Sequence, residues 1–597
     1  MTLEEVKESY NTLIAKEEIK LSKLKKDIFR IGSVRLAIVI GCIAACYFLW
    51  SDIVAVTVTI LLSVIIFLFF LKYHNRLFIR KRYCELLIAD AQNELKALNY
   101  DFSVFDGAAE KADANHSYSL DLDLFGERSF FQSINRTVTT FGKDSLADSL
   151  LDGYQHKNEI LAQQQAIKEL TPKVKLARHF RATGQMSHAG DLNINDFSEQ
   201  FLQTKLMDRN ILNYFTFIAP VAFFASAVLA ILNVIPVSVI GLCWTILFML
   251  SLIPLKNINK KKEPLDKKVS ILQTYSDLFE IIEKENFESA SLNGLKGQLN
   301  GKVLASKVIY QLKRYCDNLD QSSNVLGLLI LNPIFFWHIR YTLKIERWIN
   351  THKEDVGRWF GVLAKFDSLV SLAIFAYNHP GYSYPEVSDK LLLEGKDMGH
   401  PMINRDACVC NDVQIPHQPY FLVVTGANMA GKSTYLRTVG VNLVLACAGA
   451  PVCASSLKFY PYRLVTNLRT SDSLNDNESY FFAELKRLKM IIDRLKSGEQ
   501  LFIILDEILK GTNSEDKQKG SISLMKQLVS LSGNGIIATH DLVLGNLEKE
   551  FPSEIKNYRF EADINGEHLS FTYKMKEGIA QNMNASFLMK KMGITLE

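Results

Sequence analysis

The sequence predicts an α/β domain with a mostly parallel sheet at the C-terminal end, preceded by a helical region that two apolar hairpins accompany. Three observations predict this class. Short β-branched runs alternate with helical segments after residue 398, which is typical of a parallel sheet. Residues 120–207 and 269–377 have helical periodicity. Two runs, 31–71 and 211–255, are almost entirely apolar.

The composition excludes several classes of protein. The chain has 597 residues, 68 Lys+Arg, 64 Asp+Glu and a net charge of +4. An apolar fraction of 48% with so small a charge excludes a disordered chain, and the charge alone does not indicate nucleic acid binding. Nine Cys in this length are no disulfide framework and indicate a reducing, cytosolic compartment. Cys408 and Cys410 form a CxC without the second pair that a zinc site needs.

Each apolar run divides into two segments long enough to cross a bilayer. About 30 Å of hydrocarbon requires about 20 helical residues. The first run gives 31–50 and 53–71, and the second gives 211–232 and 237–255. The alternative is that both runs form buried hairpins in a large soluble domain. This alternative is weaker, because four segments of membrane-spanning length occur here as two adjacent pairs. A shorter apolar stretch, 325–337, is predicted to be a buried or interfacial helix rather than a span.

Lysine and arginine flank both hairpins and are absent from their tips. By the positive-inside rule, both tips face outward and the bulk of the chain faces the cytoplasm. We therefore expect an integral protein of the cytoplasmic (inner) membrane of a bacterium, in contact with membrane lipid through the two hairpins.

A phosphate-binding loop follows the predicted strand 420–425 and leads into the predicted helix 435–448. This is the GxxxxGK[ST] pattern in a strand–loop–helix context. Its glycines let backbone N–H groups converge on phosphates at the positive end of a helix. Lys432 places a cation on the phosphate oxygens, and Ser433 can offer its hydroxyl to Mg²⁺. The predicted binding residues are Gly426, Ala427, Asn428, Met429, Ala430, Gly431, Lys432, Ser433 and Thr434.

Two later strands end in side chains that suit the same chemistry of phosphates and Mg²⁺. The strand 501–505 ends in Asp506, which can join the Mg²⁺ shell, and Glu507, which can orient or deprotonate a water. The strand 535–539 ends in His540, which either senses the γ-phosphate or is structural. The predicted catalytic residues are Lys432, Glu507 and His540, and the predicted metal ligands are Ser433 and Asp506.

From residue 399 to the end, these motifs resemble the MutS family of mismatch-repair ATPases, of the ABC ATPase class. The stretch 425–437 resembles the MutS phosphate loop, and 538–540 matches its ATH motif. The segment from Ser479 to Glu484 resembles a signature segment that in this family reaches across a dimer. The resemblance therefore implies a homodimer in which Ser479 contacts the nucleotide of the partner in trans, and it implies ATP as that nucleotide.

The resemblance also implies the fold: an α/β P-loop ATPase domain of ABC and MutS type, preceded by an all-α core and lever-like domain. The apolar runs add two transmembrane helical hairpins to this architecture. The predicted segments are a cytoplasmic amphipathic helix (1–30), transmembrane hairpin 1 (31–71), a helix and linker (72–119), the first part of the core-like helical domain (120–210), transmembrane hairpin 2 (211–255), the second core and lever-like part (256–397) and the ATPase domain (398–597).

The sequence departs from the family in several respects. We expect no N-terminal mismatch-recognition domain, and the second hairpin interrupts the helical domain. The span 170–367 is short for full levers together with a DNA clamp, so DNA encirclement is not implied. Cys408 stands where the family has an adenine-stacking aromatic, which leaves the base preference open. No nuclease or helix-turn-helix region is expected after the ATPase domain.

Three functions remain open on the sequence. The first is a membrane-anchored dimeric MutS-like ATPase that hydrolyses ATP and acts on DNA, in mismatch repair or another DNA transaction. The second is an ATP-driven membrane machine, and the third a nucleotide-gated scaffold, both without a direct DNA role. One basic cluster of the helical domain either contacts phosphates or forms a solvated helix face, namely Lys302, Lys307, Lys313 and Arg314.

Overall fold

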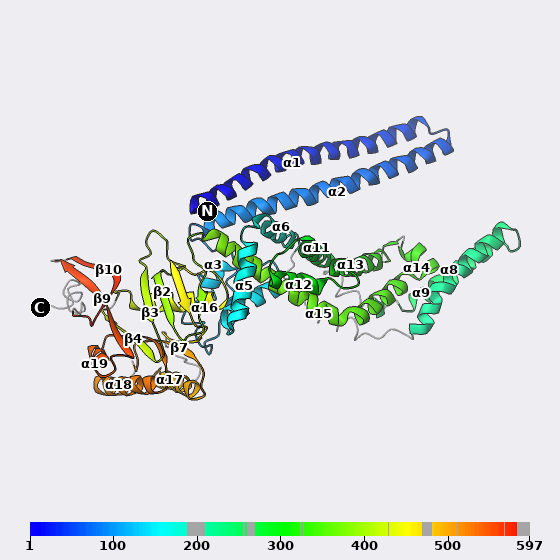
Figure 1. Ribbon diagram of the computed structural model, residues 1–597. Helices are drawn as coiled ribbons and strands as arrows, with labels where there is room; N and C mark the ends of the chain where they lie inside the picture. The colour runs from blue at the N-terminus through cyan, green and yellow to red at the C-terminus, as the bar shows by residue number, and fades with distance from the viewer. Residues whose placement is uncertain are drawn as a thin grey trace.

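The protein is described here from a computed structural model. The structure describes residues 1–187, 209–254, 257–258, 269–322, 324–325, 327–427, 429–468, 480–509, 512–565 and 568–581. Figure 1 shows an α/β region at one end, a helical region beside it, and two helical hairpins that extend away from the end where the C-terminus lies. A helical region followed by an α/β region is the predicted class, and this part of the prediction is confirmed.

The first hairpin consists of α1 (Leu3–Phe48) and α2 (Ile53–Ala97). Thr2 and Glu5 form a capping box at the start of α1, and Asp52 caps α2 by accepting from two backbone N–H groups. The helix expected over 1–30 is therefore not separate from the apolar segment, since α1 runs through both without a break. Both helices are long and apolar enough to cross a membrane, and none of their most apolar windows is buried.

The second hairpin consists of α8 (Arg209–Ile231) and α9 (Ser238–Leu252), which are separated at Asn233 with a positive φ of 59°. Its apolar helical parts, Thr216–Ile231 and Ser238–Leu252, are shorter than the predicted 211–232 and 237–255. The turn at Asn233 ends α8, which stops at Ile231, whereas α9 begins only at Ser238.

Nine further described helices, most of them around the long α15, form the helical region. They are α3 (Phe130–Ile134), α4 (Thr140–Leu151), α5 (Lys157–Leu170), α6 (Val174–Gly184), α11 (Val269–Lys284), α12 (Ala290–Leu299), α13 (Ala305–Gln321), α14 (Asn332–Phe335) and α15 (Trp337–Asn378). A short 3₁₀ turn, Ala109–Lys111, lies in the predicted linker. The apolar window of α15 also has the length and composition of a span, but 83% of it is buried inside the protein.

The close packing of α4 on α15 requires a glycine. A Cβ on Gly142 would lie 2.1 Å from Oδ2 of the buried Asp367, whose carboxylate accepts hydrogen bonds from the Thr139 N–H and hydroxyl at 2.9 and 2.7 Å. Burial raises the pKa of Asp367 to about 7, although these bonds oppose the shift. The start of the helical domain is thus fixed to the end of α15.

The predicted helix at 325–337 is instead broken into a π-helical turn, Gly327–Leu331, and the four-residue α14. Phe336 ends α14 with a left-handed φ of 48°, so α15 starts in a new direction. Asn332 stabilises this break, because its side chain donates to Ser322 O and accepts from His338 N. Asn332 is buried whereas Ile330 is exposed, so the stretch is only partly buried.

The α/β region contains two sheets. The larger has the strand order β10-β9-β4-β8-β7-β6, and all its neighbours are parallel except β9 and β10. Its strands are β4 (Tyr420–Gly426), β6 (Arg463–Asn467), β7 (Leu501–Asp506), β8 (Asn534–Thr539), β9 (Ile555–Asn565) and β10 (His568–Glu577). The smaller sheet is mixed, with the order β1-β5-β2-β3, and was not predicted.

The strands of the smaller sheet are β1 (Glu386–Val387), β2 (Leu393–Met398), β3 (Asn411–Ile415) and β5 (Ser456–Phe459). β1 and most of β2 precede residue 398, where the α/β domain was expected to begin. Helix α16 (Lys432–Cys447) packs into the core shared with the helical region, while α17 (Tyr480–Lys496) and α18 (Ser514–Ser530) belong to a second core with β7. A short 3₁₀ helix (Leu542–Asn546) and α19 (Leu547–Glu550) precede β9.

A buried ion cluster fastens the first hairpin to the helical region. Glu94 of α2 is fully buried and accepts hydrogen bonds from Arg136 Nε at 2.6 Å, Arg181 Nη1 at 2.8 Å and Asn378 Nδ2 at 2.9 Å. Asp90 also pairs with Arg181 at 2.6 Å. Burial would raise the pKa of Glu94, but the two arginines hold that pKa below its usual value. The C-terminal end of α2, which we call the foot of the first hairpin, therefore lies inside the domain core, beside the end of α15.

Candidate nucleotide-binding site

The loop between β4 and α16 has a backbone that only glycine fits at one position. Gly431 immediately precedes α16 with a left-handed φ of 105°, and a Cβ there would lie 3.1 Å from Cδ1 of Tyr573. Met429 also has a positive φ, 66°, and its side chain is 74% exposed. The N-terminus of α16 thus opens directly on the loop, where its free N–H groups can meet an anion.

Lys432 reaches back over this loop. Its Nζ donates to the carbonyl oxygens of Gly426 at 2.8 Å and Ala427 at 2.9 Å, and lies 3.3 Å from His540 Nε2. Burial lowers the pKa of Lys432 to about 8, against the opposite effect of Asp506 and Glu507. An anion bound in the loop would neutralise the buried positive charge of Lys432 and raise the pKa of this lysine.

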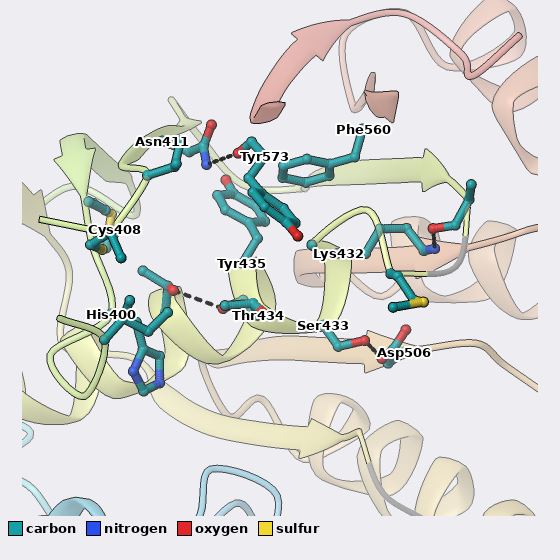
Figure 2. Close-up of a pocket in the computed structure, with 18 of the residues that line it drawn as sticks. His400, Cys408, Asn411, Lys432, Ser433, Thr434, Tyr435, Asp506, Phe560 and Tyr573 are labelled. Carbon is teal, nitrogen blue, oxygen red and sulfur yellow. Dashed lines mark hydrogen bonds between the residues drawn. The ribbon is translucent and has the colours of Figure 1, made fainter. Parts of the chain in front are cut away.

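The ends of β7 and β8 bring the remaining predicted side chains to the same edge of the sheet. Ser433 Oγ donates to Asp506 Oδ2 at 2.5 Å, and Glu507 Oε1 lies 2.8 Å from His540 Nε2. Glu507 has a left-handed φ of 56°, and its N–H donates to Ala538 O of the neighbouring strand. Figure 2 shows Ser433 and Asp506 joined at the end of the pocket that also holds Lys432.

These residues line a cavity of about 650 Å³. Its other end is formed by aromatic and polar side chains. Figure 2 shows Tyr435 and Tyr573 between the Lys432 end and the end where Cys408 and Asn411 lie. The cavity thus has a charged end that suits phosphates and a flat, aromatic end that suits a base.

Tyr573 is a site residue to which the sequence assigned no role. It sits with a φ of 53° in an irregularity of β10, between Phe571 and Met575, and is 45% exposed. Asn411 fixes this irregularity, because its Nδ2 donates to Tyr573 O at 2.9 Å and its Oδ1 accepts from Met575 N at 2.8 Å. Cys408 lines the cavity without an aromatic ring, as expected, but Tyr573 supplies a ring from another strand.

Two predicted binding residues, Asn428 and Ser479, lie outside the described residues.

The structure also shows a contact that the sequence did not predict. Glu484 of α17 is 1% exposed, and its Oε1 accepts from Leu509 N at 2.6 Å. The helix that follows the signature-like segment is therefore tied to the loop that follows Glu507. Glu484 has the helical spacing of the buried Leu488, Ile491 and Leu495, and an acidic residue in such an apolar row was the available signal.

Comparisons with known proteins agree with this geometry. A family model described as MutS domain V matches residues 422–592. The C-terminal α/β region of the chain is therefore similar to MutS domain V. Over 250 residues it is 31% identical to DNA mismatch repair protein MutS of Thermotoga petrophila, an alignment that covers 41% of this chain and 31% of that protein. The MutS of Chlorobium phaeovibrioides is 33% identical over 230 residues, covering 37% and 26%. The human MutS protein homolog 4 is 27% identical over 260 residues, covering 42% and 27%.

The similarity of this chain to its relatives is confined to a part of each protein. The chain spans about a third or less of the length of the curated relatives it matches. The resemblance found in the motifs is confirmed for the family.

Proposed function

We propose that this MutS-family chain is a membrane-anchored, dimeric ATPase that binds and hydrolyses ATP and acts on DNA. The observation that carries the proposal is the convergence of Lys432, the Ser433–Asp506 pair and the Glu507–His540 pair on one cavity at the N-terminus of α16. Such a constellation suits phosphoryl transfer to water, in which positioning and charge supply most of the catalysis.

Each residue has a role that its present contacts support. Lys432 Nζ exchanges its two carbonyl partners for phosphate oxygens, and the N–H groups at the start of α16 bind the same phosphates. Glu507 holds a water and accepts its proton, while His540 keeps the Glu507 carboxylate oriented. The side chain of Tyr573 provides a ring on which a base can stack.

The oxygens of Ser433 and Asp506 fit Mg²⁺, because a hydroxyl and a carboxylate 2.5 Å apart are the hard ligands that this ion prefers. When bound there, Mg²⁺ would neutralise part of the phosphate charge.

Dimerisation is supported by the exposure of the cavity rim and by the family resemblance. Met429 is 74% exposed and Tyr573 is 45% exposed, so the outer side of the cavity faces solvent in one subunit. Closure by Ser479 of a second subunit would complete the site. The mass of Glu507→Gln with and without ATP tests this proposal: we expect a dimer in ATP that Ser479→Arg prevents. A mass that does not depend on ATP would indicate that one subunit alone forms the nucleotide site.

Membrane anchoring is supported by the exposure of apolar side chains on both hairpins. Large apolar residues are exposed along α1, α2, α8 and α9, and contiguous apolar surface of this extent marks a membrane or partner contact. We propose the cytoplasmic membrane of a bacterium, with the α/β region inside. Single cysteines at Ser51 and Val234, in a chain without other cysteines, should react with an impermeant reagent on intact cells, and one at Lys353 should not. The reverse labelling would overturn this orientation.

An action on DNA is supported by the relatives, two of which are named DNA mismatch repair protein MutS. A salt titration of duplex binding tests it, because each phosphate contact contributes to the slope of log affinity against log salt. A slope near zero, for plain and for mismatched duplexes, would exclude phosphate contacts.

One observation favours the second candidate, an ATP-driven membrane machine or nucleotide-gated scaffold without a DNA role. Arg405 lies in the loop that lines the cavity at Ala407 and Cys408. Its N–H donates to Tyr100 Oη at 3.0 Å, just after α2, and its Nη2 donates to Asn378 O at 2.9 Å, at the end of α15. The loop at the base end of the cavity therefore contacts Tyr100, three residues after the end of α2 in the first hairpin.

A further inference from the structure

A second cavity, of about 510 Å³, lies between α13 and α15 in the helical region. Three cations line it, Lys307, Arg314 and Lys344, together with the rings of three tyrosines and two polar side chains, Gln311 and Asn318. None of the described residues that line this cavity is acidic. It is therefore a concave, basic and aromatic site, unrelated to the nucleotide cavity.

Its cations have no counter-ions among the residues that the structure describes. Lys313, one position before Arg314, shows the contrast, because it pairs with Asp317 at 2.6 Å. Lys344 lies over the rings of Tyr341 and Tyr315, at 4.7 and 5.5 Å from their centroids. Partial burial lowers the pKa of Lys344, and three nearby arginines, Arg340, Arg314 and Arg347, lower it further. Crowding of like charges around a cavity is relieved when an anion binds.

The cavity lies at the foot of the second hairpin. His338 Nε2 is 3.0 Å from Ser251 O, near the end of α9, and Trp337 Nε1 donates to Asn318 O at 2.8 Å. Figure 1 shows α14 and the start of α15 beside α9, with α13 next to them. Lys344 follows His338 by six residues, which in a helix is about 9 Å.

A row of aromatic rings connects the hairpin to the cavity. Phe224 of α8 is 6.2 Å from Phe335, which is 6.4 Å from Trp337, which is 4.8 Å from Tyr341. Trp and Tyr gather where hydrocarbon meets headgroups, and Lys and Arg that follow them on the cytoplasmic side meet the phosphates of anionic lipids. The order along the chain, Phe335 of α14 first, then Trp337 and Tyr341 of α15, then Lys344, follows this profile.

We propose that this cavity binds the phosphate of an anionic phospholipid headgroup, such as that of phosphatidylglycerol, in the cytoplasmic leaflet. The proposal rests on the proposed insertion of the second hairpin in a membrane. The cavity lies at the hairpin foot and is enclosed by two helices, which suits a single headgroup better than the extended backbone of a nucleic acid.

The test titrates the full-length protein in neutral detergent with dioctanoyl phosphatidylglycerol, dioctanoyl phosphatidylcholine and glycerol phosphate. We expect phosphatidylglycerol to bind about tenfold more tightly than phosphatidylcholine, and glycerol phosphate to bind weakly. Removal of two charges in Arg314→Gln/Lys344→Gln should reduce the affinity for phosphatidylglycerol by about tenfold or more. The matched control Lys175→Gln/Lys353→Gln, which removes two exposed lysines elsewhere in the helical region, should not change it.

Three results would overturn the headgroup site: equal affinity for the two lipids, an equal loss in the control variant, or glycerol phosphate binding as tightly as phosphatidylglycerol, which would indicate a free phosphate ligand. A loss of duplex DNA binding in the double variant, with lipid binding intact, would assign the cavity to nucleic acid instead. Flotation with pure phosphatidylcholine vesicles separates the two proposals. Protein that does not float contradicts the anchoring, whereas protein that floats without a preference for phosphatidylglycerol contradicts only this site.

Discussion

Glu507 Oε1 lies 2.8 Å from His540 Nε2, which joins the end of β7 to the end of β8 beside the phosphate loop. Both residues follow buried parallel strands, so their backbones are held by the sheet while their side chains project beyond its edge. The contact orients the carboxylate that we assign to the attacking water, and Lys432 Nζ is 3.3 Å from the same histidine nitrogen.

Glu507→Gln should separate binding from hydrolysis. The amide keeps the size of the side chain but cannot accept a proton from water, so we expect ATP hydrolysis to fall by about 10²-fold or more while ATP still binds. His540→Asn should reduce the rate less, because it removes only the group that orients Glu507. Single-turnover phosphate release together with equilibrium ATP binding measures both effects. Loss of binding in Glu507→Gln would contradict the assigned role.

ATP binding should be coupled to protonation of Lys432. Its pKa in the free protein is about 8, and phosphate should raise this pKa. Near pH 8.5 a part of the lysine population is therefore neutral, so binding should take up protons and the affinity should fall as the pH rises further. Near pH 7 the lysine is already charged and the uptake should nearly vanish. Calorimetry in buffers of different ionisation enthalpy measures this uptake, and equal uptake at both pH values would exclude Lys432 as its source.

Tyr573→Ala should weaken nucleotide binding by about tenfold or more, since stacking of a base on an aromatic ring contributes about 1–3 kcal/mol. Tyr573→Phe is the matched control and should bind ATP normally, because it keeps the ring. Pyrophosphate, which has no base, should bind equally to all three proteins. Weaker pyrophosphate binding in Tyr573→Ala would instead indicate damage to the loop at Gly431, which Tyr573 contacts.

Glu94→Gln should destabilise the protein by about 3–5 kcal/mol, because it leaves Arg136 and Arg181 buried with one carboxylate fewer. The pKa of Glu94 is lowered in the folded state, so its contribution is present above the unfolded pKa of about 4.3 and is lost progressively as the pH falls from there through the lower folded pKa. Chemical denaturation near pH 7 measures the loss. Glu18→Gln, on the exposed face of α1, is the control and should have little effect. Equal stability of the two variants would show that the cluster does not hold the hairpin.

The parts of the site that the sequence predicts are those encoded by short stretches of chain. Gly431, Lys432 and Ser433 adjoin one another, and Asp506 and His540 each follow an apolar strand, so the edge of a parallel sheet must bring them together. Tyr573 could not be placed in this way. Its position depends on an irregularity of β10 that is held by Asn411, more than 150 residues earlier in the chain.

The same distinction applies to the fold. The apolar hairpins and the α/β alternation are predictable from local patterns. The cluster of Glu94, Arg136 and Arg181 is not, because each charge by itself has the sequence context of a surface residue and only tertiary packing buries it. The break at Phe336 likewise depends on the contacts of Asn332 with Ser322 and His338, which no periodicity indicates.

Binding and hydrolysis of ATP in this cavity can be measured as the steady-state rate of phosphate release from Mg²⁺–ATP, for the full-length protein and for Lys432→Ala. Loss of the cation that contacts the phosphates should abolish turnover and strongly weaken ATP binding. We expect turnover in the wild type and none in the variant. No turnover in the wild type, or equal turnover in both proteins, would contradict this expectation.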